Sequence, residues 1–208
     1  MRSLEKIALC LVALVQSGCV AAAAAKPDRP AMTEAAYPGE LIDSAALPDG
    51  LFLRQRVEAH YPGGSASFAA VLQTADGVLS LVGLTPYGAR AFLIEQRGQT
   101  IRYTQYVAHE LPFPPRFILL DVHRALFRAL PNAPLADGLH SGEDRGEALT
   151  EQWAQGHLVV RTYRRLNGHP VDLITVRYGA PAAATRWPDL IELDNAWFGY
   201  RLTIRNLP

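Results

Sequence analysis

The sequence has few cysteines, no excess of charge of either sign and no long apolar run. It contains 208 residues, with 20 Lys and Arg against 20 Asp and Glu and only 2 Cys. A balanced charge lacks the positive field by which nucleic-acid-binding domains attract phosphates. We therefore expect no nucleic-acid partner, and the length suits one globular domain.

The sequence also lacks the motifs of metal, nucleotide and nucleophilic chemistry. None of its 6 His residues stands at a zinc-ligand spacing, so each is expected to be a surface or strand residue. Neither a P-loop nor a GxGxxG fingerprint occurs. Gly63–Ser67 lacks the last glycine of a GxSxG elbow. We therefore expect no catalytic residue, no metal and no cofactor. An enzyme that acts on lipid or glycan is a further alternative, but no motif supports it.

Paired carboxylates are the remaining catalytic pattern to consider. Glu143, Asp144 and Glu147 form an acidic cluster near His140 and Arg145. Two such carboxylates could hydrolyse a glycosidic bond. The surrounding stretch is polar and rich in Gly and Pro, so the favoured interpretation is a solvated loop.

The N-terminus has the pattern of an export signal. Arg2 and Lys6 precede the apolar run Ile7–Val15. As a helix this run would rise only about 14 Å, against a hydrocarbon core of about 30 Å, so it cannot remain as a membrane span. We expect residues 1–18 to be a signal peptide.

Ser17-Gly18-Cys19 resembles a bacterial lipobox, in which the cysteine is acylated, for example with palmitate, and becomes the new N-terminus. Because Cys10 lies in the segment removed, Cys19 would be the only cysteine of the mature chain, and no intramolecular disulfide could form. Several acyl chains would hold Cys19 stably on a membrane. The alternative is cleavage after the alanines of Ala21–Ala25, which would free a soluble periplasmic protein.

Val20 follows the expected lipidation site. Enterobacterial lipoproteins that stay in the inner membrane carry aspartate there. By that resemblance the protein is lipid-anchored at the periplasmic face of the outer membrane, so a membrane is its first expected partner.

Beyond the signal, the chain divides into a tether and a domain. Residues 19–47 are rich in alanine and proline and have few large apolar side chains, so we expect a lipidated N-terminus and a flexible tether. Residues 48–208 are expected to form the folded domain.

Short strands separated by turn signals dominate from Leu51 onward. Phe52–Ala59 alternates polar and apolar residues, which gives a strand one apolar face. Asp76-Gly77 favours a type I′ hairpin turn, and Asn167-Gly168 marks another. The expected strands are 52–59, 68–73, 78–84, 90–96, 101–107, 157–165, 171–178, 190–193 and 200–206, and 148–154 is ambiguous.

One helix is expected in the middle of the chain. Apolar residues recur at helical spacing over Arg116–Leu130, while Asp121, Arg124 and Arg128 share a polar side. Pro131 would end this helix. The following stretch, up to Glu147, is predicted to be a loop.

These elements predict a mainly β (α+β) fold. About nine or ten strands with one inserted helix suit a curved antiparallel sheet better than alternating βαβ units. We expect the sheet to form an open half-barrel around the one main helix, with an apolar concave side that side chains do not fill completely.

Several stretches occur in an order typical of a known family. They are Phe68–Gln73, Leu81-Val82-Gly83-Leu84-Thr85-Pro86 followed by Gly88, Leu111-Pro112, Phe117–Leu130 and Gly199-Tyr200-Arg201-Leu202-Thr203-Ile204. With the exported cysteine, this order resembles the bacterial lipoproteins grouped as domain of unknown function 3261. Members are often encoded with aryl-polyene pigment genes, and their layout is similar to the lipoprotein-localisation proteins LolA and LolB, open β-barrels with a helical lid that carry acyl chains. The resemblance implies an outer-membrane lipoprotein that binds or passes on a lipid-like molecule.

The expected function is therefore noncatalytic binding or transfer of an acyl or polyene-type lipid in envelope assembly. Phe113 and Phe117 could instead only fix the helix start to the sheet. The alternative function is a lipoprotein that docks an envelope transport protein through a sheet edge or the 131–147 loop and has no ligand cavity. The residues expected to contact a hydrophobic ligand are Leu79, Leu81, Phe92, Phe113, Phe117, Val122 and Leu126.

Overall fold

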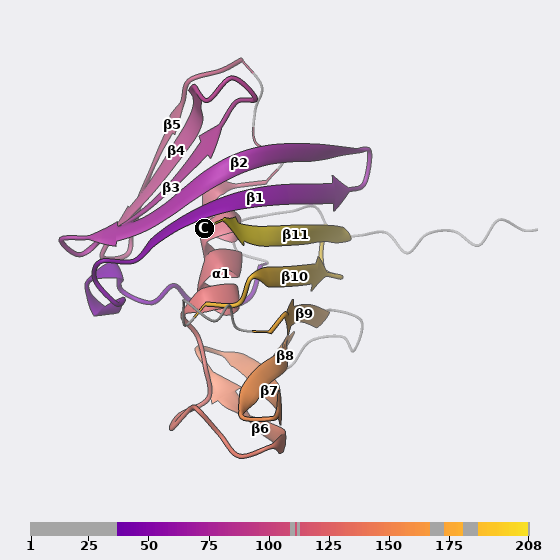
Figure 1. Ribbon diagram of the computed structural model, residues 1–208. Coiled ribbons are helices and arrows are strands. Elements are labelled where there is room, and N and C mark those ends of the chain that lie inside the picture. Colours follow the sequence, from indigo (N-terminus) through magenta and orange to yellow (C-terminus); the bar gives the residue numbers. More distant parts are fainter. Residues whose placement is uncertain (1–36, 109–110, 112, 167–172, 181–186, 208) are drawn as a thin grey trace, which may run out of the picture. The chain divides into compact units, whose positions relative to one another are not determined.

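The computed structural model describes residues 37–108, 111, 113–166, 173–180 and 187–207. These residues form an antiparallel sheet of 11 strands, one α-helix and one short 3-10 helix (Figure 1). The mainly β fold with a single inserted helix is confirmed. The elements are η1 (Ser44–Ala46), β1 (Phe52–Tyr61), β2 (Gly64–Ala75), β3 (Val78–Leu84), β4 (Arg90–Arg97), β5 (Thr100–Gln105), α1 (Pro115–Leu126), β6 (Gly138–Asp144), β7 (Glu147–Ala154), β8 (His157–Arg165), β9 (Leu173–Tyr178), β10 (Leu190–Asn195) and β11 (Tyr200–Leu207).

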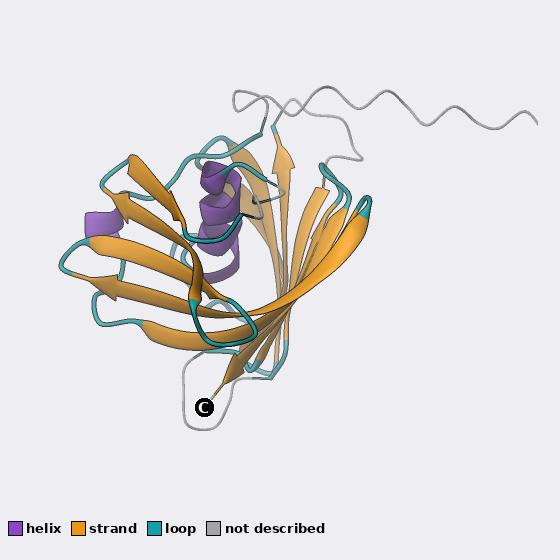
Figure 2. Cartoon of the chain, turned by 90° about the horizontal axis from the view of Figure 1, so that it is seen from above, coloured by secondary structure: helices purple, strands orange, loops and turns teal. Residues whose placement is uncertain are grey.

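The sheet consists of two meanders that meet at its centre. The strand order is β5-β4-β3-β2-β1-β11-β10-β9-β8-β7-β6, so the first and last strands pair with each other. The edges are β5 and β6, and α1 carries the chain from one edge to the other. Figure 2 shows the sheet curving around α1, which lies on the concave side. The predicted open half-barrel is therefore confirmed.

Local sequence accounts for the hairpins. Asp76 and Gly77 have φ angles of 52° and 70°, as a type I′ turn requires of both central residues. In β1 the residues from Phe52 to Ala59 alternate between exposed and buried, as their pattern predicts. The expected turn at 167–168 lies outside the described residues.

Two predicted boundaries were wrong. The stretch predicted as a loop up to Glu147 contains β6, which pairs along its whole length with β7. An edge strand with largely exposed residues has no apolar alternation to reveal it. The helix ends at Leu126 and not at Leu130, because the amides of Phe127 and Arg128 both bond to the carbonyl of His123 and the chain then turns toward β7.

The folded domain begins earlier than expected. Residues 37–47, assigned to the tether, pack into the core, with Tyr37 5% and Leu41 1% exposed. The side chain of Asp43 caps η1 by accepting a hydrogen bond from the amide of Ala45. The expected signal peptide and Cys19 lie outside the described residues.

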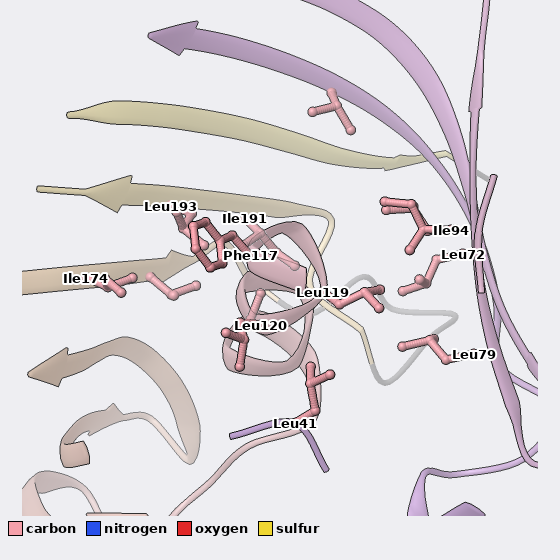
Figure 3. Packing of buried hydrophobic residues seen from close by; sticks show 14 of the residues in the cluster. Leu41, Leu72, Leu79, Ile94, Phe117, Leu119, Leu120, Ile174, Ile191 and Leu193 are labelled. Carbon is pink, nitrogen blue, oxygen red and sulfur yellow. The ribbon is translucent and has the colours of Figure 1, made fainter. Parts of the chain in front are cut away.

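The tightly packed part of the core lies between α1 and the inner face of the sheet. Figure 3 shows Leu119 pointing from α1 toward Leu72, Leu79 and Ile94, all fully buried. On another side of the helix, Phe117 lies near Leu193 (Figure 3). One helix thus contacts both halves of the curved sheet.

Candidate functional site: an apolar cavity beside the helix

A cavity of about 340 Å³, here called the main cavity, lies between α1 and the sheet. Its volume falls within the range of roughly 300 to 1,000 Å³ typical of small-molecule sites. Strands β1–β4, β10 and β11 form its walls together with α1 and the segments at Pro86, Val107 and Phe113. Most of the lining side chains are apolar, among them Val57, Ala59, Phe68, Ala70, Ile191, Leu202 and Ile204.

Five of the seven residues expected to contact a ligand line the main cavity. They are Leu81, Phe92, Phe113, Val122 and Leu126. They come from β3, β4, the segment before α1 and α1 itself. The fold thus brings Leu81 and Leu126, which are 45 positions apart in the sequence, to the same cavity.

The other two, Leu79 and Phe117, do not line this cavity. Both are fully buried in the packed core. The ring of Phe117 lies 4.7 Å from that of Tyr37 and 5.4 Å from that of Phe198. They lie instead in the packed core: Leu79 faces Leu119 (Figure 3), and Phe117 joins an aromatic cluster.

Sequence reasoning missed the alanines that leave the cavity open. Ala59 and Ala66 lie opposite each other in the β1–β2 pair, and both line the cavity with Ala70 and Ala91. Small residues at inward-facing positions leave space that larger ones would fill. The alternation of the strands was readable, and alanines at its inward positions were the available signal.

Gly83 leaves room for the ring of Phe92 in one wall of the main cavity. A Cβ atom at this position would overlap the ring of Phe92, which lies against β3. The Phe92 ring also contacts Phe68, with centroids 6.0 Å apart. Glycine therefore lets two aromatic rings form the wall without occupying the cavity.

We expect Gly83→Ala to push the Phe92 ring into the main cavity. Overpacking of this kind typically costs about 1 to 3 kcal/mol of unfolding free energy, which urea denaturation would measure, and binding of a fluorescent fatty acid should weaken several-fold. The double variant Gly83→Ala/Phe92→Leu should regain most of the stability. An unchanged unfolding free energy in the single variant would contradict this assignment.

The polar side of α1 is buried against the other half of the sheet. Arg124 lies 2.7 Å from Asp121 and 3.0 Å from Glu147, and all three side chains are shielded from solvent. Arg128 pairs with Glu147 and, at 2.5 Å, with Asp144. The interpretation of the acidic cluster as a solvated loop was therefore wrong for Asp144 and Glu147, although Glu143 is exposed.

Side chains of β8 and β9 complete the C-terminal end of the helix. The last carbonyls of a helix have no partner within it. The hydroxyl of Tyr163 and the guanidinium of Arg161 donate to the carbonyl of Arg124, at 2.9 Å and 3.1 Å. The hydroxyl of Tyr178 donates to the carbonyl of Ala125 at 2.9 Å. Arg161 itself is paired with Glu151 at 2.8 Å, so this cation is neutralised where it is buried.

The buried ion pairs around the end of α1 are here called the polar seam. They comprise Asp121, Arg124, Arg128, Asp144, Glu147, Glu151 and Arg161. Of these residues, Asp121 also lines the main cavity. Its carboxylate accepts hydrogen bonds from Tyr37 at 2.5 Å, from Asn195 at 3.3 Å and from Tyr200. Burial raises the pKa of Asp121 above its ordinary value, against the opposing effect of Arg124. Asp121 and Tyr200 line the cavity but are bonded to each other, so a ligand there meets a largely apolar surface.

His123 is also buried, contrary to the expectation of a surface or strand residue. The amide of Ile42 donates to its Nδ1 at 3.0 Å, so Nε2 carries the proton and donates to Gln96 at 2.9 Å. Burial, together with Arg128, Arg145 and Arg124, lowers its pKa to about 3. The imidazole is therefore a neutral bridge between α1, β4 and the segment before η1.

Acid should destabilise the domain through His123. With a folded pKa of about 3 and an unfolded value near 6.5, the unfolded state binds the extra proton between these pH values. The stabilisation is present above about pH 6.5 and is lost as the pH falls, by about 1.4 kcal/mol per unit. We expect the difference in unfolding free energy between the protein and His123→Asn, which keeps an acceptor for Ile42, to shrink by about 2.5 kcal/mol between pH 7.5 and 4.5. A pH-independent difference would contradict a neutral His123.

The buried polar atoms are bonded to one another. Within the described ranges, every buried side-chain nitrogen or oxygen has a hydrogen-bond partner. Among the same residues no three His, Cys, Asp or Glu side chains gather closely enough to hold a metal ion. These bonds hold α1 against the sheet, while the main cavity beside the helix stays open.

The part of the chain that the structure describes has no helix long and apolar enough to cross a membrane.

The described residues thus form an open half-barrel with a single α-helix and an apolar cavity beside it. The chain belongs to the family described as "Protein of unknown function (DUF3261)", whose model matches residues 53–208. The family membership expected from the order of its apolar stretches is confirmed.

Two solved structures resemble part of this chain. A LolA superfamily protein from Nitrosomonas europaea has a TM-score of 0.46 at 12% identity, covering 77% of this chain and 84% of its own. A domain from Vibrio parahaemolyticus, named for outer membrane lipoprotein sorting, has a TM-score of 0.40 at 7% identity, covering 77% and 86%. At these scores and identities we take nothing about function from either. No curated protein has a matching sequence.

Proposed function

We propose that this protein is a noncatalytic lipoprotein of the outer membrane that binds the hydrocarbon chain of a lipid in its main cavity during envelope assembly. The observation that carries the proposal is the apolar lining of this 340 Å³ cavity on the concave side of the sheet. Each methylene moved from water into such a lining contributes about 0.8 kcal/mol. With few polar contacts, affinity should depend on chain length more than on the identity of the lipid.

Chain length provides the direct test of this function. Straight-chain fatty acids of increasing length should compete with a bound fluorescent fatty acid, and each added methylene should tighten binding by roughly fourfold until the cavity is full. A protein that binds no fatty acid of any length would contradict the proposal. Solvent extraction of protein purified from membranes, followed by mass spectrometry, should then identify the lipid carried in cells.

The proposed anchor is tested separately. Cys19 is the proposed acylation site, so the protein should incorporate an alkyne-labelled palmitate in growing cells and remain with the outer membrane. Cys19→Ala should abolish both the label and the membrane association. Release of an unlabelled protein into the periplasm without any substitution would favour the soluble alternative.

The docking alternative assumed a half-barrel with no ligand cavity. The described residues instead line a cavity of about 340 Å³, which supports the carrier function over this alternative. An envelope transport protein remains a proposed partner to which a lipid-loaded protein would deliver its ligand.

A further inference from the structure

A second cavity of about 250 Å³, here called the side cavity, lies beside the C-terminal end of α1. It faces the opposite half of the sheet from most of the main cavity, with walls from β7, β8 and β9 and from the segment at Trp187 and Pro188. Nothing in the proposed function uses it.

The two cavities adjoin. Ala125 and Leu126 of α1 line both of them. Across the β9–β10 pair, Tyr178 of the side cavity lies directly opposite Ile191 of the main cavity. Side chains at opposed positions of an antiparallel pair have Cβ atoms only about 5 Å apart. The two cavities therefore share one stretch of wall, at Ala125 and Leu126, next to the hydrogen bond between the Tyr178 hydroxyl and the Ala125 carbonyl.

The side cavity has a different chemistry from the main cavity. Three large aromatic side chains, Trp153, Tyr178 and Trp187, line it together with Arg161 and the exposed His157. Such rings combine an apolar face with a polar edge. This surface suits a group that has an apolar C–H face and carries hydroxyls.

The charge of the side cavity is balanced. Arg161 is buried and paired with Glu151 at 2.8 Å, and its guanidinium also donates to the hydroxyl of Tyr178 at 3.2 Å. A guanidinium already neutralised by a carboxylate attracts an anion weakly, because the anion would compete with Glu151. The lining therefore favours an uncharged group over a phosphate or a carboxylate.

We propose that the side cavity binds the head group of the amphiphile whose chain occupies the main cavity, and that this head group is an uncharged sugar ring. The inference rests on the proposed function, since it places the second end of the same ligand. Leu126 marks the boundary between the chain and the head group.

The test compares three amphiphiles with the same chain, all below their micellar concentrations. Dodecyl glucoside, dodecyl phosphocholine and dodecanoic acid would each displace a bound fluorescent fatty acid from the purified protein. The phosphate of the phosphocholine would have to compete with Glu151 for Arg161, whereas the glucose ring can pack its C–H face on the aromatic rings, so the glucoside should bind about tenfold more tightly than the phosphocholine.

Substitutions test whether the preference for the glucoside arises in the side cavity. Leu158→Trp, which fills the side cavity from β8, should weaken glucoside binding about tenfold and change dodecanoate binding less than about twofold. Leu139→Trp, on an exposed position of β6 outside both cavities, should change neither. If Leu158→Trp does not fold, His157→Ala at an exposed site should still weaken the glucoside about threefold.

The outcomes separate the two claims. Equal affinities for the three amphiphiles, or a loss in Leu158→Trp that is as large for dodecanoate as for the glucoside, would overturn the head-group site and leave the carrier function standing. Failure of all three to bind would remove both.

Discussion

Glu147→Gln is expected to lower the unfolding free energy by about 3 to 5 kcal/mol, the usual cost of removing one partner from a buried ion pair. Glu147 lies at the start of β7, is fully buried and contacts both Arg124 and Arg128. The glutamine would leave these two guanidiniums with less negative charge in a place that water does not reach. Urea denaturation followed by circular dichroism would measure the loss.

Glu143→Gln supplies the matched control, because this residue is on the same hairpin but exposed. Surface substitutions usually change stability by less than about 0.5 kcal/mol. If the two variants lost similar amounts, or if Glu147→Gln lost less than about 1 kcal/mol, the claim that this carboxylate seats the helix would be refuted.

Val122→Trp is expected to weaken fatty acid binding by about 50-fold. Val122 is on the face of α1 that lines the main cavity and is only partly buried there. An indole in that place should displace roughly three methylenes of a bound chain, at about 0.8 kcal/mol each. Titration of the protein with a fluorescent fatty acid would give the affinity.

Leu139→Trp adds the same ring to β6, where the side chain is 71% exposed and lines neither cavity. Its affinity for the fatty acid should equal that of the unsubstituted protein. Comparable weakening in both variants would mean that the probe binds somewhere other than the main cavity. Thermal unfolding should confirm that Val122→Trp keeps its fold, because space for the ring already exists.

The strands and the overall fold were predictable because their signals are local. Asp76-Gly77 specifies its own turn, and the alternation in β1 specifies one buried face, so each hairpin can be recognised without its neighbours. The edge strand β6 lacked such a signal, since its pairing partner supplies its stability.

The burial of charge was not predictable from the sequence. Arg124 and Asp121 look like an ordinary exposed i, i+3 pair on an amphipathic helix. Their burial depends on Glu147 in β7, 23 residues beyond Arg124, and on Tyr37 at the other end of the domain. Charges of this kind are recognisable as internal only when both partners are placed in space.

The sequence identified only some of the residues that line the main cavity, because apolar patterns do not show where a side chain ends up in space. Helical spacing correctly placed Val122 and Leu126 on an apolar face. It could not separate them from Phe117, which shares the helix but points into the aromatic cluster with Tyr37 and Phe198. Residues that line an apolar cavity and residues that pack in the core have the same sequence pattern, because both positions need apolar side chains.

The central claim is that a hydrocarbon chain lies between α1 and the curved sheet. A crystal structure of the protein bound to a fatty acid labelled with bromine at its methyl end would locate that chain by anomalous scattering. The account predicts a bromine peak inside the main cavity, within contact of Leu81, Phe92 or Val122. A peak on the outer face of the sheet, with the main cavity free of the fatty acid, would contradict it.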